Sequence, residues 1–281
     1  MTIYNETKCE LGEGPLWHPR RGELFWFDIL NRTLHTQAKS WSFDEIVSAA
    51  GWIDENTLVI ATETAFKTFD IETGNSGHLH DLEADSPNTR SNDGRIDPWG
   101  GFWIGTMGKS AEQNAGAIYR LYKGKLRKLY PDITIPNSIC FSPDRAYAYF
   151  SDTLTHVVQR QALDEKDGWP IGAPEPFIDL SAEQQNPDGA VVDREGNLWL
   201  ALWGSSCVSC FNDKGNRLFS LPFSASQTSC PAFGGDDLST LFVTSAMEGM
   251  SGEARAKEPD AGKTFAQGTD LFGQEEHRFI P

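Results

Sequence analysis

Oxygen-bearing side chains recur at one position of a phrase that the chain repeats. The position lies five residues before a turn residue, and in chain order it holds Glu13, Ala49, Asn92, Asn137, Asp188 and Pro231. Asn and Asp often cap turns when taken singly. As a set, however, carboxylate and amide oxygens are the ligands that hard divalent cations prefer. If the repeat brings Glu13, Asn137 and Asp188 together, burying two carboxylates requires a counter-charge. We therefore predict one divalent metal ion held by these three side chains.

The same repeat predicts the fold that must position them. Apolar or aromatic strands open at Leu24, Leu58, Phe102, Tyr147, Leu198 and Leu241, and successive openings are 34, 44, 45, 51 and 43 residues apart. A period near forty residues with several short strands per unit is typical of a β-propeller blade. The sequence predicts an all-β, six-bladed β-propeller that forms a single domain over residues 1–281.

Two segments outside the repeats have specific expectations. A ring of blades leaves two open sheet edges unless the N-terminal strand pairs into the final sheet, and residues 3–9 are the candidate for that pairing. Residues 247–262 are polar and rich in glycine, so we predict a loop there. No segment has convincing helical periodicity.

The bulk composition excludes several classes of function. The formal net charge of -16 argues against binding to nucleic acid or to an anionic membrane surface. The first residues lack a basic and an apolar region, and no run approaches 18 apolar residues, so we predict a cytoplasmic protein. Five cysteines, an odd number, fit a reducing compartment. No serine-hydrolase elbow or nucleotide-binding glycine motif is present. The sequence does not predict the oligomeric state.

Four phrases carry a resemblance to a known family. They are LGEGPLW at 11–17, RSNDG at 90–94, IPNS at 135–138 and NPDG at 186–189. Together they resemble the senescence marker protein / gluconolactonase / luciferin-regenerating enzyme family, in order and over nearly the whole chain. The resemblance implies a six-bladed propeller with one divalent metal ion in its channel. It implies that Glu13, Asn137 and Asp188 are the metal ligands and that Arg90 and Asn92 bind the substrate's hydroxyls and ring.

The activity implied by this resemblance is hydrolysis of a sugar (aldono-) lactone to the aldonic acid, of the gluconolactonase or pentonolactonase type. A metal ion with three protein ligands keeps open positions for water and for a small-molecule lactone. Asp188 is the candidate catalytic residue, as a general base besides being a ligand, a role that the resemblance suggests. A carboxylate committed to a cation is a poor base, so geometry must decide this point.

Several alternatives remain open. All-oxygen ligation suits calcium, which we favour, and also magnesium or manganese, while zinc enters through the resemblance alone. Glu112 matches a further substrate contact only weakly, and His156 is a candidate for the channel wall. A non-enzymatic calcium-binding regulator would use the same ligands, although it would not need Arg90 and Asn92. A propeller that only binds other proteins needs no converging carboxylates, and a paraoxonase-like esterase uses two calcium ions.

Overall fold

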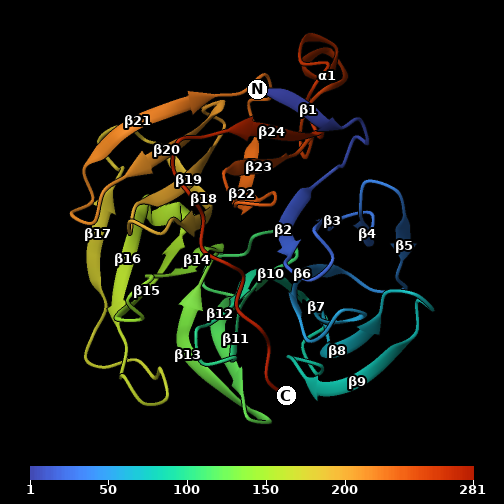
Figure 1. Cartoon of the computed structure of the whole chain (residues 1–281), viewed down its shortest axis with the longest axis vertical. Coiled ribbons are helices and arrows are strands. Elements are labelled where there is room, and N and C mark those ends of the chain that lie inside the picture. The colour runs from blue at the N-terminus through green and yellow to red at the C-terminus, as the bar shows by residue number, and fades with distance from the viewer.

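The computed structural model describes residues 1–281 and contains six antiparallel sheets of four strands each. Figure 1 shows the six sheets around a common centre, so the prediction of an all-β, six-bladed β-propeller is confirmed. In each of the first five sheets the strands follow one another outward from the centre. These sheets are β2 (Gly12–His18), β3 (Glu23–Asp28), β4 (Thr33–His35) and β5 (Ser40–Ser42); β6 (Val47–Trp52), β7 (Thr57–Thr62), β8 (Ala65–Asp70) and β9 (Ser76–Asp81); β10 (Thr89–Ile96), β11 (Phe102–Gly108), β12 (Gly116–Tyr122) and β13 (Lys125–Ile133); β14 (Pro136–Phe141), β15 (Tyr147–Asp152), β16 (Val157–Ala162) and β17 (Glu175–Asp179); and β18 (Asn186–Val192), β19 (Leu198–Trp203), β20 (Cys207–Phe211) and β21 (Arg217–Pro222).

The sixth sheet joins the two ends of the chain. It contains β22 (Thr228–Gly234), β23 (Thr240–Ser245), β24 (Thr264–Gly268) and β1 (Thr2–Asn5), and β1 pairs antiparallel with β24. Ile3 lies opposite Phe265 in this pairing. The expected closure of the ring by the N-terminal strand is confirmed, although the strand ends at Asn5 and residues 6–9 lie outside it. The pairing removes the edge that the last sheet would otherwise expose.

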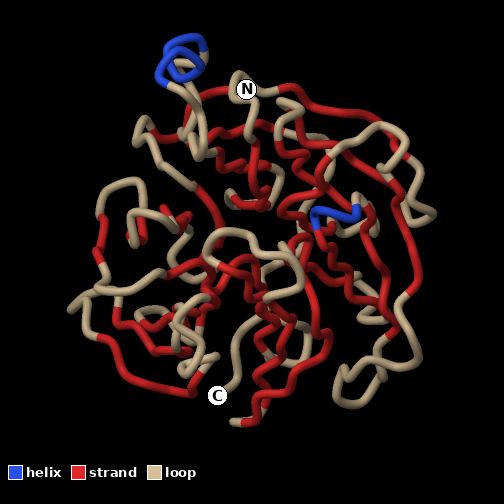
Figure 2. Tube along the Cα trace, turned by 180° about the vertical axis from the view of Figure 1, so that it is seen from behind, coloured by secondary structure: helices blue, strands red, loops and turns tan.

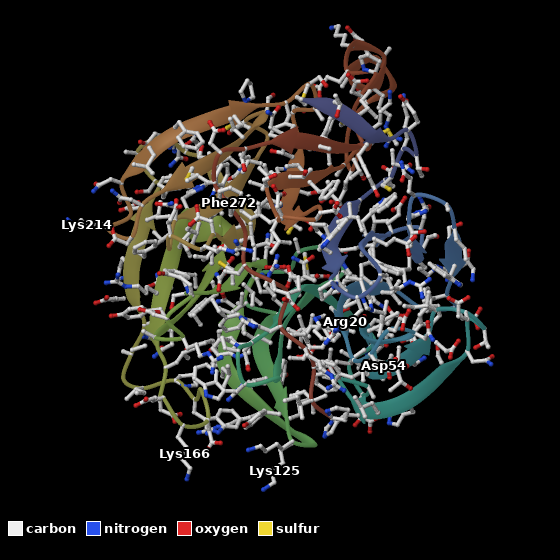
Figure 3. The ribbon with its side chains drawn as sticks, in the orientation of Figure 1. Arg20, Asp54, Lys125, Lys166, Lys214 and Phe272 are labelled. Carbon is white, nitrogen blue, oxygen red and sulfur yellow. The ribbon has the colours of Figure 1, made fainter.

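The core lies between neighbouring sheets rather than inside any one of them. One apolar cluster joins Phe25 and Phe27 of β3 to Phe69 of β8, across the boundary between the first two blades. A sheet that is covered on both faces reads as a continuous apolar run, and every residue of β11 is buried. The outermost strand β21 is mostly exposed instead. In Figure 3, Lys125, Lys166 and Lys214 point away from the ring at its perimeter.

Two short helical segments interrupt the strands. A 3-10 turn, η1 (Thr153–Thr155), follows β15 and lies near the centre of the ring in Figure 2. The helix α1 (Gly252–Lys257) projects from the ring beside the N-terminus, so the prediction of a loop over 247–262 is wrong for these residues. Ser251 caps the helix by accepting a hydrogen bond from the backbone N–H of Ala254 at 3.2 Å. None of its residues is buried, and therefore it has no apolar stripe to recognise in the sequence.

The C-terminal tail crosses one face of the ring from β24 to the end of the chain (Figure 1). The side chain of Gln274 donates to the backbone oxygens of Phe141 and Val192, where β14 and β18 end. The indole of Trp52, the last residue of β6, donates to the backbone oxygen of Glu276 at 2.7 Å. The tail therefore ties several blades together at the ends of their innermost strands. Neither helical segment has the length and apolar character needed to cross a membrane.

Candidate functional site

A cavity of about 450 Å³ opens at the opposite end of the innermost strands, where they begin. All five of the site residues predicted from the sequence line it: Glu13, Arg90, Asn92, Asn137 and Asp188. They come from β2, β10, β14 and β18, four different blades, and each is at most 8% exposed. The structure therefore brings together residues that are far apart in the chain, since Glu13 and Asp188 are separated by 175 positions.

Three innermost strands lose their regular pairing at the residues that line the cavity. The register shifts between Glu13 and Leu16 in β2, between Asn137 and Cys140 in β14, and within Pro187 to Ala190 in β18. Such bulges bend a strand and re-aim a side chain. They explain how these residues leave the sheet and line the cavity.

Glycine follows both predicted carboxylate ligands for steric reasons. Gly14 has a φ of +54°, and a Cβ atom there would lie 2.3 Å from the backbone oxygen of Ser48. A Cβ atom on Gly189 would lie 2.3 Å from the sulfur of Cys230. Real Cβ atoms do not approach other atoms so closely, so these glycines allow neighbouring blades to pack tightly around the channel.

Hydrogen bonds fix the orientation of the Asn137 amide. Its Nδ2 donates to Thr153 Oγ1 at 2.8 Å, and Thr153 Oγ1 donates to the backbone oxygen of Pro187 at 2.8 Å. Its Oδ1 accepts from Asn92 Nδ2 at 3.0 Å. Asn92 Oδ1 accepts in turn from Arg90 Nη1 at 2.8 Å. The chain of contacts leaves the Asn137 oxygen with one further lone pair, which suits a metal ligand.

The two carboxylates form no salt bridge, although the charge of Arg90 in the same cavity opposes the rise in the pKa of Glu13. Neither Glu13 nor Asp188 forms an ion pair, although both are buried. Burial, and next the charge of Asp93, raises the pKa of Glu13 to about 8. Burial, and next the charges of Glu13 and Asp93, raises the pKa of Asp188 well above its usual range. Ionising both groups in this cavity therefore requires a nearby positive charge.

The chemistry of this donor set fits a hard divalent cation. No three His, Cys, Asp or Glu side chains are grouped as ligands of a metal ion, so the fit depends on the amide oxygen of Asn137 as the third ligand. Asp93 does not line the cavity, and its Oδ2 accepts from the backbone N–H of Ile139 at 2.7 Å. The innermost strands thus offer two carboxylates and one amide oxygen as ligands.

Other residues of the cavity wall were not predicted from the sequence. These include Lys109, Thr153, Trp203 and Glu248. Thr153 and Glu248 lie on connections between strands, outside the repeated phrase. A signal existed only for Trp203, because it ends the aromatic strand β19.

Two residues that the sequence left open lie elsewhere. Glu112 is exposed, and its carboxylate accepts from the backbone N–H of Ser110 at 3.0 Å. His156 does not line the cavity, and its Nδ1 lies 3.0 Å from the backbone oxygen of Gln185.

The fold and the cavity define a β-propeller with a polar site at the mouth of its central channel. The model of the SMP-30/Gluconolactonase/LRE-like region matches residues 11–247, and the chain belongs to this family. The family resemblance stated from the sequence is therefore confirmed.

Similar proteins cover almost the entire chain. A Rhizobium meliloti protein that is provisionally named a sugar lactone lactonase is 42% identical, over 98% of this chain and 95% of its own length. The 6-deoxy-6-sulfogluconolactonase of Pseudomonas putida is 33% identical, over 96% of this chain and 94% of its own. The crystal structure of a calcium-binding protein, regucalcin, from Agrobacterium tumefaciens is 40% identical and superposes with a TM-score of 0.97, covering 100% of this chain and 97% of that one.

Proposed function

We propose that this protein is a metal-dependent sugar lactonase that hydrolyses an aldonolactone to the aldonic acid. The observation that carries the proposal is the convergence of Glu13, Asn137 and Asp188 with Arg90 in one cavity. The names of the relatives from Rhizobium meliloti and Pseudomonas putida support lactone hydrolysis. The proposal adds the metal ion, the residues that hold it and the class of lactone.

Glu13, Asn137 and Asp188 would hold the cation. A bound divalent cation supplies a Lewis acid that polarises the lactone carbonyl and lowers the pKa of a bound water. We favour calcium, because all three ligand atoms are oxygens. The Agrobacterium tumefaciens relative, described as a calcium-binding protein, agrees with this choice.

Arg90 would position the lactone. It is 5% exposed, and its Nη1 donates to Asn92 Oδ1 and to the backbone oxygen of Ser91. Its Nε is buried and has no hydrogen-bond partner in the protein. A buried donor without a partner costs free energy, and a substrate oxygen would satisfy it.

Asp188 would act as the general base. Water attacks the lactone carbonyl carbon, and the carboxylate of Asp188 accepts the proton that the water loses. The bond from the carbonyl carbon to the ring oxygen then breaks, and the same proton passes to the departing oxygen, which gives the open hydroxy acid. A general base must be ionised to accept a proton, and the bound cation would favour that ionised form of Asp188.

Proton release from a panel of aldonolactones tests this function. We expect metal-dependent acceleration over spontaneous ring opening, its loss with a chelator and its return when metal is added back. Asp188→Ala should lose both metal binding and turnover. Spontaneous rates with every lactone would refute the proposal, and full turnover by Asp188→Ala would refute the ligand assignment.

A second candidate is a calcium-binding protein without lactonase activity. The description of the Agrobacterium tumefaciens relative as a calcium-binding protein favours it. Calorimetry distinguishes the two. The regulator would bind calcium stoichiometrically at Glu13 and Asp188 and leave every lactone unhydrolysed.

A further inference from the structure

Glu248 brings a free carboxylate to the wall of the cavity. It lies in the connection between β23 and α1, is partly exposed and lines the same cavity as Arg90. Only its backbone oxygen has a protein partner, which is Gln227 Nε2 at 3.0 Å. Its carboxylate forms no hydrogen bond or ion pair with the protein, so its oxygens can accept hydrogen bonds from a molecule in the cavity.

The turn that carries Glu248 is anchored on both sides. Arg255 of α1 donates to the backbone oxygens of Met247 and Met250, each at 3.1 Å. The same guanidinium donates to both carboxylate oxygens of Glu10, at 2.9 and 2.5 Å. The backbone N–H of Met247 donates to the backbone oxygen of Glu10 at 2.9 Å. The fold therefore holds this turn against the first blade, and a positioned acceptor loses less conformational entropy on binding than a mobile one.

Donor and acceptor are both available to a ligand in this cavity. Arg90 offers the buried Nε–H without a partner, and Glu248 offers a carboxylate. Burial lowers the pKa of Arg90, and the negative charge of Glu248 opposes that change. The two side chains are therefore close enough to interact electrostatically. Sugar hydroxyls donate and accept hydrogen bonds, so a hydroxylated lactone can satisfy both side chains. The oxygens of an unsubstituted lactone only accept, so they can satisfy Arg90 but not the carboxylate of Glu248.

We propose that Glu248 is a specificity-determining residue that accepts a hydrogen bond from one hydroxyl substituent of the lactone. The inference rests on the proposed lactonase function and names a further contact in the same site. A site that is built to bind a hydroxyl rejects the analogue without it, because the carboxylate loses water and gains no partner. Glu248 thereby selects hydroxylated lactones over deoxy analogues.

The test compares substrate and protein changes in one cycle. The best substrate of the aldonolactone panel and its monodeoxy analogues, one for each free hydroxyl, are offered to the wild type, to Glu248→Ala and to Glu253→Ala. Glu253 is the control, because it lies in the following helix α1, outside the cavity, with its side chain 78% exposed. We expect one deoxy analogue to lose about tenfold to a hundredfold in kcat/KM with the wild type and with the control, as for a hydrogen bond to a charged group. With Glu248→Ala, this loss should shrink to about twofold or less.

Two results would overturn the inference while leaving the lactonase proposal intact. One is an active Glu248→Ala variant that shows the same losses as the wild type for every deoxy analogue. The other is an equal fall in kcat/KM for the parent lactone and all of its deoxy analogues, because the side chain would then act on the fold or the metal site. A wild type that hydrolyses no aldonolactone of the panel would instead overturn the proposed function, and the inference with it.

Discussion

Replacing Glu13 with glutamine should make the metal-free protein more stable. The pKa of Glu13 rises from 4.5 to about 8, first because of burial and next because of Asp93. An acid whose pKa is raised by folding binds more protons in the folded state, so stability falls as pH rises from the ordinary value to the raised one. At pH 7 the difference corresponds to roughly 3 kcal/mol, and near pH 5 to about 1 kcal/mol or less. Glutamine cannot ionise, and its amide oxygen can still accept the 3.1 Å hydrogen bond from Gly14. Near pH 8 the same relation gives roughly 4 kcal/mol, part of which the burial of the polar amide offsets. We therefore expect Glu13→Gln to raise the free energy of unfolding by about 1–3 kcal/mol near pH 8, and by much less near pH 5.

With metal bound, we expect the wild type to become more stable than Glu13→Gln. A ligand at a hundred times its Kd stabilises the folded state by about 2.7 kcal/mol. The wild type gains this stabilisation, while Glu13→Gln loses a charged ligand and gains little. Urea unfolding near pH 5 and pH 8, with EDTA or with calcium, measures all four conditions. Glu183→Gln is the control, because Glu183 is exposed and makes no side-chain hydrogen bond or ion pair.

Two results would refute this reasoning. The first is a Glu13→Gln protein that is less stable than the wild type in EDTA near pH 8, because the charge of Glu13 would then not be costly. The second is a calcium-induced stabilisation of the variant equal to that of the wild type, because Glu13 would then not be a ligand.

Three further substitutions test other parts of the structure. Arg90→Lys should raise KM for the lactone about tenfold, because a lysine lacks the planar fork and Nε–H of arginine. Initial rates measure KM, and an unchanged value would contradict the role of Arg90 in substrate binding. Glu276→Ala leaves Arg95 without its buried partner, so urea unfolding should show a loss of about 3–5 kcal/mol, whereas a surface pair would cost less than about 1. Gly189→Ala should lower the melting temperature, because the added Cβ would lie 2.3 Å from the sulfur and 2.8 Å from the Cα of Cys230. Calorimetry measures this, and an unchanged melting temperature would contradict the steric argument.

The fold and the centre of the site could be predicted because the propeller repeats. Glu13, Asn137 and Asp188 occupy one repeated position, and successive blades place that position around a single axis. The β6 and β22 strands hold Ala49 and Pro231 there, so these blades contribute no oxygen. The bulges that aim the side chains could not be predicted from the strand pattern, because a bulge is defined by the pairing with the neighbouring strand.

The parts that sequence reasoning missed depend on contacts between distant residues. Arg255 meets Glu10 across 245 positions, and Trp52 meets Glu276 across 224. Neither contact leaves a local pattern, and α1 lacks the apolar stripe that predicts a helix.

The residues proposed for metal binding and the residue proposed for substrate specificity lie in different parts of the fold. The carboxylates and the amide of the proposed metal site lie on innermost strands, whose packing on both sides tolerates little change. Glu248 lies on a connection at the surface, which the rest of the propeller does not need in order to close. Connections of this kind accept substitutions and insertions more easily than packed strands do. Relatives can therefore share the strand residues and still differ in the lactone that they accept, and the residues to compare between them are those of the turn around Glu248 and the Arg255 contacts that hold it.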